Sequence, residues 1–451
     1  MKNYKKVYAA FILAGGLILH GCNGIFDDLA INPNQPSMGA YFTSPSAVND
    51  AVMTMYGYMS TQRCLGASGS KTTIIRSDEA SSNSDYGKPG MFGADLNASY
   101  YTIEQPYTLM YTTASQASYI IETAPSVDFS GNEELRNAYM GEAYFWRAFA
   151  HYYLLINFRN ISPIRQMPRN GDDYVRPLEK PAAVWNFIQE DLAHAKELLP
   201  VKGYWDSKNA GRVTKASAAA LLGKAYLYRS GIEQYYGEDK TTFYSEAAKE
   251  FGDVIDGKYG TYDLTKNYAD NFDVAHENNE ESILEFQFLG DVDNAGFNPG
   301  LATSGLAFDS RGLMLPGAGV GYEGVVHNWL YNAFVNSVDK DGYTDIRMFS
   351  TMIFNDLDAS IHLRNDAGGN PVRLEGPGGY KWEELYPAKN GKEGFATVSN
   401  PLAHSFKAGI RKGIDCSMPT QTEADGTPKL VGVGAGVKEY VYNQPRAHGV
   451  N

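Results

Sequence analysis

Apolar residues recur every three or four positions through much of the first half of the chain, which is the spacing of helices that bury one face. The pattern predicts a series of helices within residues 47–59, 107–124, 135–158, 184–199, 215–230 and 243–255. The helix within 135–158 is apolar on nearly all sides after Tyr144, so we expect it at the centre of the fold.

The helices follow one another as hairpins, without the alternation of strands and helices that builds a parallel sheet. Gly223, Ala247 and Phe251 match the small and large positions of a tetratricopeptide unit. The two helices of this unit are separated by a longer loop than usual, and Tyr235 and Tyr236 are expected in that loop. The sequence therefore predicts a mainly α fold, a tetratricopeptide-like stack of helical hairpins with a loop-rich second half packed against it.

Other stretches lack helical periodicity. Residues 68–96 are rich in Ser, Gly, Asn and Asp, which predicts a long loop. Apolar and polar residues alternate in 284–288, as in a short strand. After Gly290 the glycine content rises and periodicity fades, apart from a helix expected near 329–335.

The N-terminus has the pattern of a secretory signal, because lysines precede the uncharged, mostly apolar run 7–19. That run is too short to span a bilayer. It ends close to Gly21 and Cys22, where a bacterial lipobox places its lipidated cysteine, although His20 departs from the usual small residue. We expect a lipoprotein; a plain secretory peptide is the alternative.

These features predict three parts. Residues 1–21 are the signal peptide and 22–46 a lipidated tether. Residues 47–451 form one domain, with a helical part at about 47–260 and a loop-rich part at about 261–451.

Charge and cysteine content narrow the function. The chain has 451 residues and a formal net charge of -13, which argues against a nucleic-acid partner bound through its phosphates. The two remaining cysteines, Cys64 and Cys416, lie far apart, and an exported protein could keep them paired or free. Neither belongs to a CxxC motif, so neither redox chemistry nor a zinc site is expected.

Several motifs have a chemical interpretation that their context does not favour. Glycines recur in 317–321 and 432–436, but no following Gly-Lys-Ser/Thr makes a phosphate loop. The acidic residues of 339–345 lack the terminal Glu of a calcium loop, and a solvated turn is favoured. Glu142 and Arg147 lie in one apolar helix, where a buried structural pair is favoured over a catalytic acid and its anchor. No catalytic residue, metal or cofactor is therefore expected.

Short degenerate motifs occur in a fixed order along the chain, at 44–45, 77–79, 141–148, 190–192, 198–200, 211–215, 218–222, 281–285 and 345–347. Their order resembles that of the SusD/RagB family, the outer-membrane glycan-binding lipoproteins of Bacteroidetes. Asp27 and Asp28, just after Cys22, resemble the acidic tether of surface-exported lipoproteins. The resemblance covers most of residues 22–350.

The C-terminus departs from the family. Members usually continue with an Arg- and Tyr-rich helix and a further helical pair, whereas the last residues of this sequence lack helical periodicity. The C-terminal family segment is therefore expected to be missing or divergent.

The resemblance implies a glycan-contacting face made by loops. Sugar rings present apolar CH faces to aromatic rings and hydroxyl groups to polar side chains. The candidate aromatic ligands are Tyr86, Phe92, Tyr100, Tyr101, Tyr322 and Trp329, and the candidate polar companions are Asp78, Asn83 and Asp85. Aromatic residues on helices are expected in the core.

The resemblance implies a cell-surface lipoprotein of the outer membrane, held by lipid on Cys22, that binds oligosaccharide or polysaccharide. Such a protein passes its glycan to a SusC-like TonB-dependent transporter and performs no chemistry itself. Two alternatives remain, namely a surface enzyme that degrades glycans or peptides, and a helical-repeat adaptor that binds protein.

Overall fold

The computed structural model of the chain is dominated by helices. It describes residues 42–61, 64–65, 80–81, 98–99, 101–167, 175–237, 239–272, 276–287, 325–326, 330, 333–334, 336–343, 345, 347, 430–434 and 437–440. The α-helices of this part are α4 (Pro45–Ser60), α6 (Tyr101–Thr123), α7 (Glu133–Phe158), α8 (Pro181–Leu198), α9 (Lys215–Tyr236) and α10 (Tyr244–Ile255). Short 3-10 turns occur at η2 (Ala124–Ser126), η4 (Ser207–Asn209) and η5 (Tyr268–Phe272). The prediction of a mainly α fold is confirmed.

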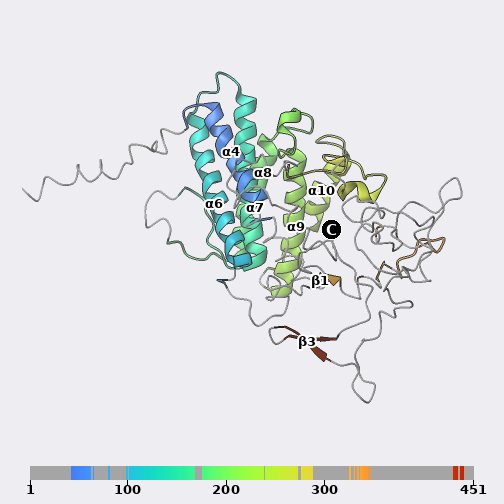
Figure 1. Ribbon diagram of the computed structural model, residues 1–451. Coiled ribbons are helices and arrows are strands. Elements are labelled where there is room, and N and C mark those ends of the chain that lie inside the picture. The colour runs from blue at the N-terminus through green and yellow to red at the C-terminus, as the bar shows by residue number, and fades with distance from the viewer. Residues whose placement is uncertain are drawn as a thin grey trace, which may run out of the picture.

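The α-helices stand side by side, and each packs against the next one along the chain (Figure 1). Local chemistry sets several of their starts. The Ser44 hydroxyl accepts a hydrogen bond from the amide of Ala47 at 3.3 Å, and Pro45 occupies the first helical position of α4. The Asn132 side chain caps α7 by accepting the amide of Leu135 at 3.1 Å.

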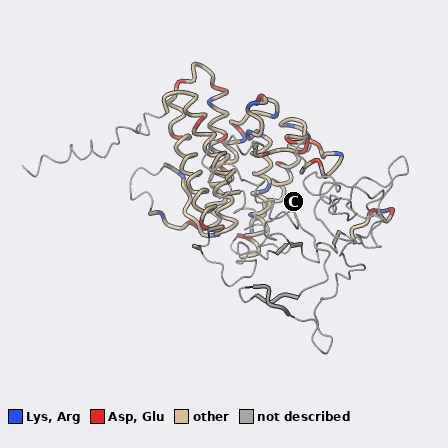
Figure 2. Tube along the Cα trace, in the orientation of Figure 1, with Lys and Arg blue, Asp and Glu red and all other residues tan. Residues whose placement is uncertain are grey.

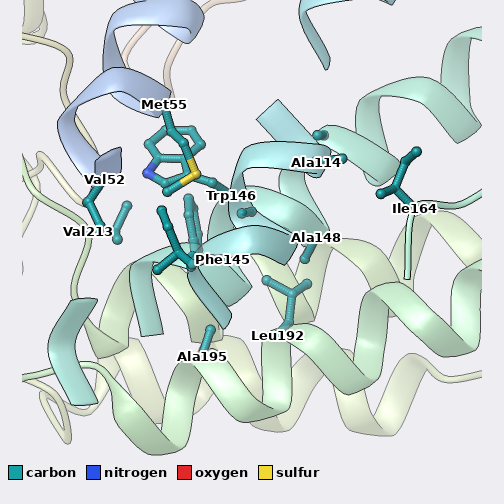
Figure 3. Packing of buried hydrophobic residues seen from close by; sticks show 14 of the residues in the cluster. Val52, Met55, Ala114, Phe145, Trp146, Ala148, Ile164, Leu192, Ala195 and Val213 are labelled. Carbon is teal, nitrogen blue, oxygen red and sulfur yellow. The ribbon is translucent and has the colours of Figure 1, made fainter. Parts of the chain in front are cut away.

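The core is centred on α7, as its apolar sequence predicts. Trp146 of α7 is fully buried, and Met55 of α4 lies beside it (Figure 3). Leu192 and Ala195 of α8 cover another side of the same helix. Burial of each large apolar side chain contributes about 1.5–3 kcal/mol, so this contact region holds the helices in a fixed register.

Three expectations about local structure are wrong. Tyr101, expected in a loop, is the first residue of α6. Tyr235 and Tyr236, expected in a loop, form the last turn of α9, because the helix stops only at Gly237, which adopts a left-handed conformation at φ 69°. Residues 284–287 belong to no strand, and Leu284 and Phe286 pack against the helical core instead.

The described strands form two small antiparallel ladders. Strand β1 (Ala80–Ser81) pairs with β2 (Val325–Val326), which joins segments far apart in the sequence. Strands β3 (Leu430–Gly434) and β4 (Val437–Tyr440) form the other ladder. Gly432 therefore lies in a β-ladder and not at the strand-to-helix turn that a phosphate-binding loop requires.

Charged residues of both signs are interspersed along the helices (Figure 2). None of the helices described has the length and the apolar composition that crossing a bilayer would require.

Candidate functional site

Glu142 of the central helix α7 forms a buried ion pair with Arg212, which is distant in the sequence. The Arg212 guanidinium donates two hydrogen bonds to the buried Glu142 carboxylate, at 2.9 Å and 2.5 Å. The Tyr56 hydroxyl donates to the same carboxylate at 2.7 Å and accepts the amide of Val213 at 2.8 Å. Burial raises the pKa of Glu142, and the hydrogen bonds from Arg212 and Tyr56 oppose that rise.

Arg147 has a different partner. Its guanidinium makes two hydrogen bonds of 2.7 Å to the carboxylate of Asp191 on α8. It also donates to the Ser118 hydroxyl at 3.1 Å and to the carbonyl of Arg165 at 2.9 Å. The expectation of buried structural charges is therefore correct, but Glu142 and Arg147 do not pair with each other.

His151 is a structural residue on the same helix. Its Nε2 accepts the amide of Ile164 at 2.9 Å, so its Nδ1 carries the proton and donates to the carbonyl of Arg147 at 2.8 Å. Burial lowers the pKa of His151 to about 3, because a charged imidazole would be desolvated there. Among the residues described, no group of three or more His, Cys, Asp or Glu could hold a metal ion.

Most of the predicted ligand-binding residues lie outside the described part of the chain. These are Asp78, Asn83, Asp85, Tyr86, Phe92, Tyr100, Tyr322 and Trp329, and the lipidation residue Cys22 lies outside it as well. Tyr101 is described only as the start of α6. The β1–β2 ladder nevertheless joins the two stretches of sequence that carry the other candidates.

Two further expectations concern charged and cysteine residues. In the acidic segment 339–345, the Asp339 carboxylate accepts the amides of Asp341 and Tyr343, as expected of a turn. Cys64 is buried and has a free thiol, while Cys416 lies outside the described residues.

A cavity of about 710 Å³ lies where the C-terminal ends of α7 and α9 meet the N-terminal ends of α8 and α10. Its wall includes Trp185 of α8 and four tyrosines, Tyr228, Tyr235, Tyr236 and Tyr244. Trp185 is buried, whereas all four tyrosines are exposed, and Tyr235 is 84% exposed. This volume falls in the range of about 300–1,000 Å³ that is typical of small-ligand pockets.

Arg159 forms part of the rim and has an unusual backbone. Its φ and ψ are 61° and -67°, and the amide of Asn160 donates to the carbonyl of Phe158 at 2.7 Å. Together these values describe the strained type of γ-turn with positive φ, which is rare for a residue other than glycine.

The Arg159 side chain is held on two sides. It donates two hydrogen bonds to Glu233 of α9, at 2.8 Å and 2.7 Å, and its guanidinium lies 4.1 Å from the ring centre of Tyr236. The Glu233 carboxylate is fully buried and also accepts the indole N–H of Trp185 at 2.8 Å. This cluster ties the end of α7 to α8 and α9.

The apolar spacing alone does not reveal this cavity, because it predicts Tyr235 and Tyr236 in a loop and not in the last turn of a helix packed beside α8. The available signal was Gly237, which marks the end of α9 and so places Tyr235 and Tyr236 in its last, exposed turn.

Comparison with known proteins finds similarity to SusD-like proteins, the family that the order of the sequence motifs resembles. Residues 31–227 match the SusD-like family model described as "Starch-binding associating with outer membrane". A SusD-like protein of Bacteroides ovatus is 26% identical over 293 residues, which are 64% of this chain and 51% of that protein. The chain thus spans about half the length of this curated relative.

Solved structures share the fold. A SusD superfamily protein from Bacteroides vulgatus superposes with a TM-score of 0.55 at 21% identity, covering 71% of this chain and 63% of that one. A laminarin-binding SusD-like protein gives a TM-score of 0.54 at 22% identity, covering 70% of this chain and 67% of that one. The solved structures thus show the fold of the chain, and the family model and the curated relative show that its sequence is similar to SusD-like proteins.

Proposed function

We propose that this chain is a surface lipoprotein of the outer membrane that captures oligosaccharide and passes it to a SusC-like TonB-dependent transporter. The family description, which names starch binding and association with the outer membrane, supports the ligand class and the location. The laminarin-binding relative supports a β-glucan as one form of that ligand.

The observation that carries the proposed site is the β1–β2 ladder. It pairs Ala80 with Val326, so two stretches of sequence that carry candidate ligands are joined by backbone hydrogen bonds. Asp78 precedes Ala80 by two residues, and Trp329 follows Val326 by three. Aromatic rings supply the stacking faces, and carboxylates the hydrogen-bond acceptors, that a sugar requires.

Binding is tested by isothermal titration of the purified protein, first with maltoheptaose and laminarihexaose and then with a wider glycan array. Tyr86→Ala and Trp329→Ala should each weaken binding and leave the melting temperature nearly unchanged. Truncation of a core aromatic instead costs about 3–5 kcal/mol of stability. Leu264→Ala, an exposed apolar residue, is the control for a neutral surface change. Unchanged affinity in both folded variants would reject the loop site.

Capture without chemistry is tested by incubating the protein with each bound glycan and with peptides. No product should form, and turnover would instead favour a surface enzyme. A protein that binds none of the glycans but retains a protein partner would favour the adaptor alternative.

Anchoring is tested with Cys22→Ala and membrane fractionation. Without the thiol that receives lipid, the variant should be soluble or remain as precursor, because the lipid chains provide the membrane affinity. A variant that still fractionates wholly with the outer membrane would contradict the lipobox interpretation.

A further inference from the structure

The cavity at the ends of α7, α8, α9 and α10 has features that the loop site does not explain. Four exposed tyrosines gather around it, and exposed aromatic rings that cluster in this way are a common feature of binding surfaces. The rings of Tyr235 and Tyr236 meet nearly at a right angle, at 88° with centroids 5.2 Å apart. Arg159 covers one face of Tyr236, whereas Tyr235 is mostly exposed to solvent.

Arg159 is held in place at the rim by contacts with two residues of α9. Arg159 is kept in its strained γ-turn by its bonds to the buried Glu233 and by its contact with Tyr236. A backbone strain of this kind costs about 1–3 kcal/mol and persists only where its surroundings impose it, which is common at ligand-binding sites. The cluster therefore fixes both a planar donor and an aromatic ring at the cavity mouth.

The ring of the buried Tyr152 packs against two residues of the cavity wall. The Tyr152 ring is 5.9 Å from Trp185 and 5.9 Å from Tyr228, both of which line the cavity. Within the described part of the chain, no group hydrogen-bonds to the Tyr152 hydroxyl. Burial raises the pKa of this hydroxyl, so it stays protonated. A buried polar group of this kind is normally satisfied by water or by a ligand.

Charge selects the ligand class. Among the described residues that line the cavity, Arg159 is the one that carries a formal charge, and Glu233 neutralises it. A cation would meet the guanidinium, and an anion would compete with a carboxylate that already holds it. The walls therefore favour a neutral ligand with flat apolar faces and hydroxyl groups at its edges.

We infer that this cavity is a second carbohydrate site, in which Tyr235 stacks on a sugar ring and Arg159, Asn157 and the neighbouring tyrosine hydroxyls bond to its hydroxyls. The inference rests on the proposed function for its ligand class, but it places the contact on the helical stack and not on the loops. A second site would let one chain hold a polysaccharide at two points, and this raises the apparent affinity for long glycans over short ones.

Two substitutions test the site in different ways. Tyr235→Ala removes the stacking ring from an exposed position, and Tyr235→Phe keeps the ring as its matched control. Gly231→Leu adds bulk without removing any contact, because a Cβ at Gly231 would meet no atom within 4 Å. Leucine also favours the helix over glycine, so this variant should fold at least as well as the natural chain.

Each variant is titrated with maltoheptaose, laminarihexaose and the parent polysaccharides, alone and combined with Tyr86→Ala and Trp329→Ala. We expect Tyr235→Ala and Gly231→Leu to weaken polysaccharide binding about tenfold, which corresponds to about 1.4 kcal/mol. Tyr235→Phe and the surface control Leu264→Ala should bind as the natural chain does. In the background without the loop aromatics, the remaining binding should disappear with Tyr235→Ala.

The outcomes separate the two proposals. Binding that is lost with the loop variants but unchanged by Tyr235→Ala and Gly231→Leu would overturn the second site and leave the proposed function standing. Binding that depends on Tyr235 alone would support the second site and reject the loop site. A chain that binds no glycan, or whose cavity binds only a proline-rich peptide, would overturn the inference.

Discussion

The buried ion pair between Arg147 and Asp191 predicts that loss of one member costs more stability than replacement of both by apolar residues. The two side chains are 7% and 3% exposed and are joined by two hydrogen bonds of 2.7 Å. Asp191→Asn keeps the shape of the carboxylate but removes its charge, which leaves the guanidinium buried without a counterion. Breaking a buried pair in this way costs about 3–5 kcal/mol.

The double change Arg147→Met with Asp191→Leu removes both charges and fills the space with apolar atoms. Such replacements are often neutral or stabilising. Here the Arg147 guanidinium also donates a hydrogen bond to the carbonyl of Arg165, and leaving this carbonyl without a donor costs about 1–3 kcal/mol. The double variant should therefore lose about 1–3 kcal/mol, less than Asp191→Asn alone.

Urea unfolding followed by circular dichroism measures both free energies. The matched control is Glu179→Gln, because Glu179 pairs with Arg165 at 2.7 Å but the two side chains are 30% and 41% exposed. An exposed pair contributes about 0–1 kcal/mol, so this variant should lose little stability. An Asp191→Asn variant no less stable than the Glu179→Gln control would refute the argument that the Arg147 pair is desolvated.

Three further predictions concern the same helical core. The pKa of His151 is about 3 in the folded protein and about 6.5 in an unfolded chain. The neutral His151 side chain therefore contributes its full share of folding stability above pH 6.5, and this share is lost as the pH falls toward 3. The stability deficit of His151→Gln should therefore shrink by about 2–3 kcal/mol between pH 7 and pH 4.5 in urea unfolding; a constant deficit would contradict it. In thermal unfolding, Gly141→Ala should cost about 1–3 kcal/mol of stability, because the added Cβ would lie 3.0 Å from the backbone nitrogen of Leu199. Its control is Gly252→Ala, which should be neutral or stabilising because a Cβ there would meet no atom within 4 Å. Tyr56→Phe should cost about 1–3 kcal/mol in the same assay, since it removes the hydroxyl between a buried carboxylate and a buried amide; a cost near zero would place water in that position.

The helices could be predicted from the sequence because their stability comes from a repeated local pattern. The apolar spacing in 184–199 and the following Pro200 place α8 within a few residues of its observed ends. The apolar spacing predicts the end of α9 too early, at Ser230, whereas Gly237 is the residue that supplies the left-handed C-cap.

The short strand expected at 284–288 shows where local pattern fails. Leu284 and Phe286 do alternate with polar residues, but they alternate because one side of an extended segment packs on the helices. The polar partners bond locally, as when the Glu285 carboxylate accepts the amide of Asn278 at 2.9 Å. A strand needs a neighbour to pair with, and no spacing within one segment reveals whether a neighbour exists.

The partners of the buried charges are not predictable from the sequence either, because a local pattern does not show which residues become neighbours in space. Glu142 and Arg147 are close in the chain, yet α7 turns them toward different neighbours. Glu142 bonds to Arg212, just before α9, and Arg147 bonds to Asp191 on α8. Charge patterning identifies which residues are unusual in an apolar helix, but only packing decides which opposite charge each one meets.

Neither the backbone conformation nor the ion-pair partner of Arg159 follows from the local sequence. Its backbone conformation is costly for any side chain, so no local preference would place an arginine there. Two hydrogen bonds to a fully buried carboxylate of α9 compensate, because leaving Glu233 without its cation would cost more than the strain of the turn. The position of Arg159 therefore depends on how α7 and α9 are registered against each other, and the packing of the core determines that register. The cavity mouth is consequently shaped by long-range contacts, which no pattern within a single helix reveals.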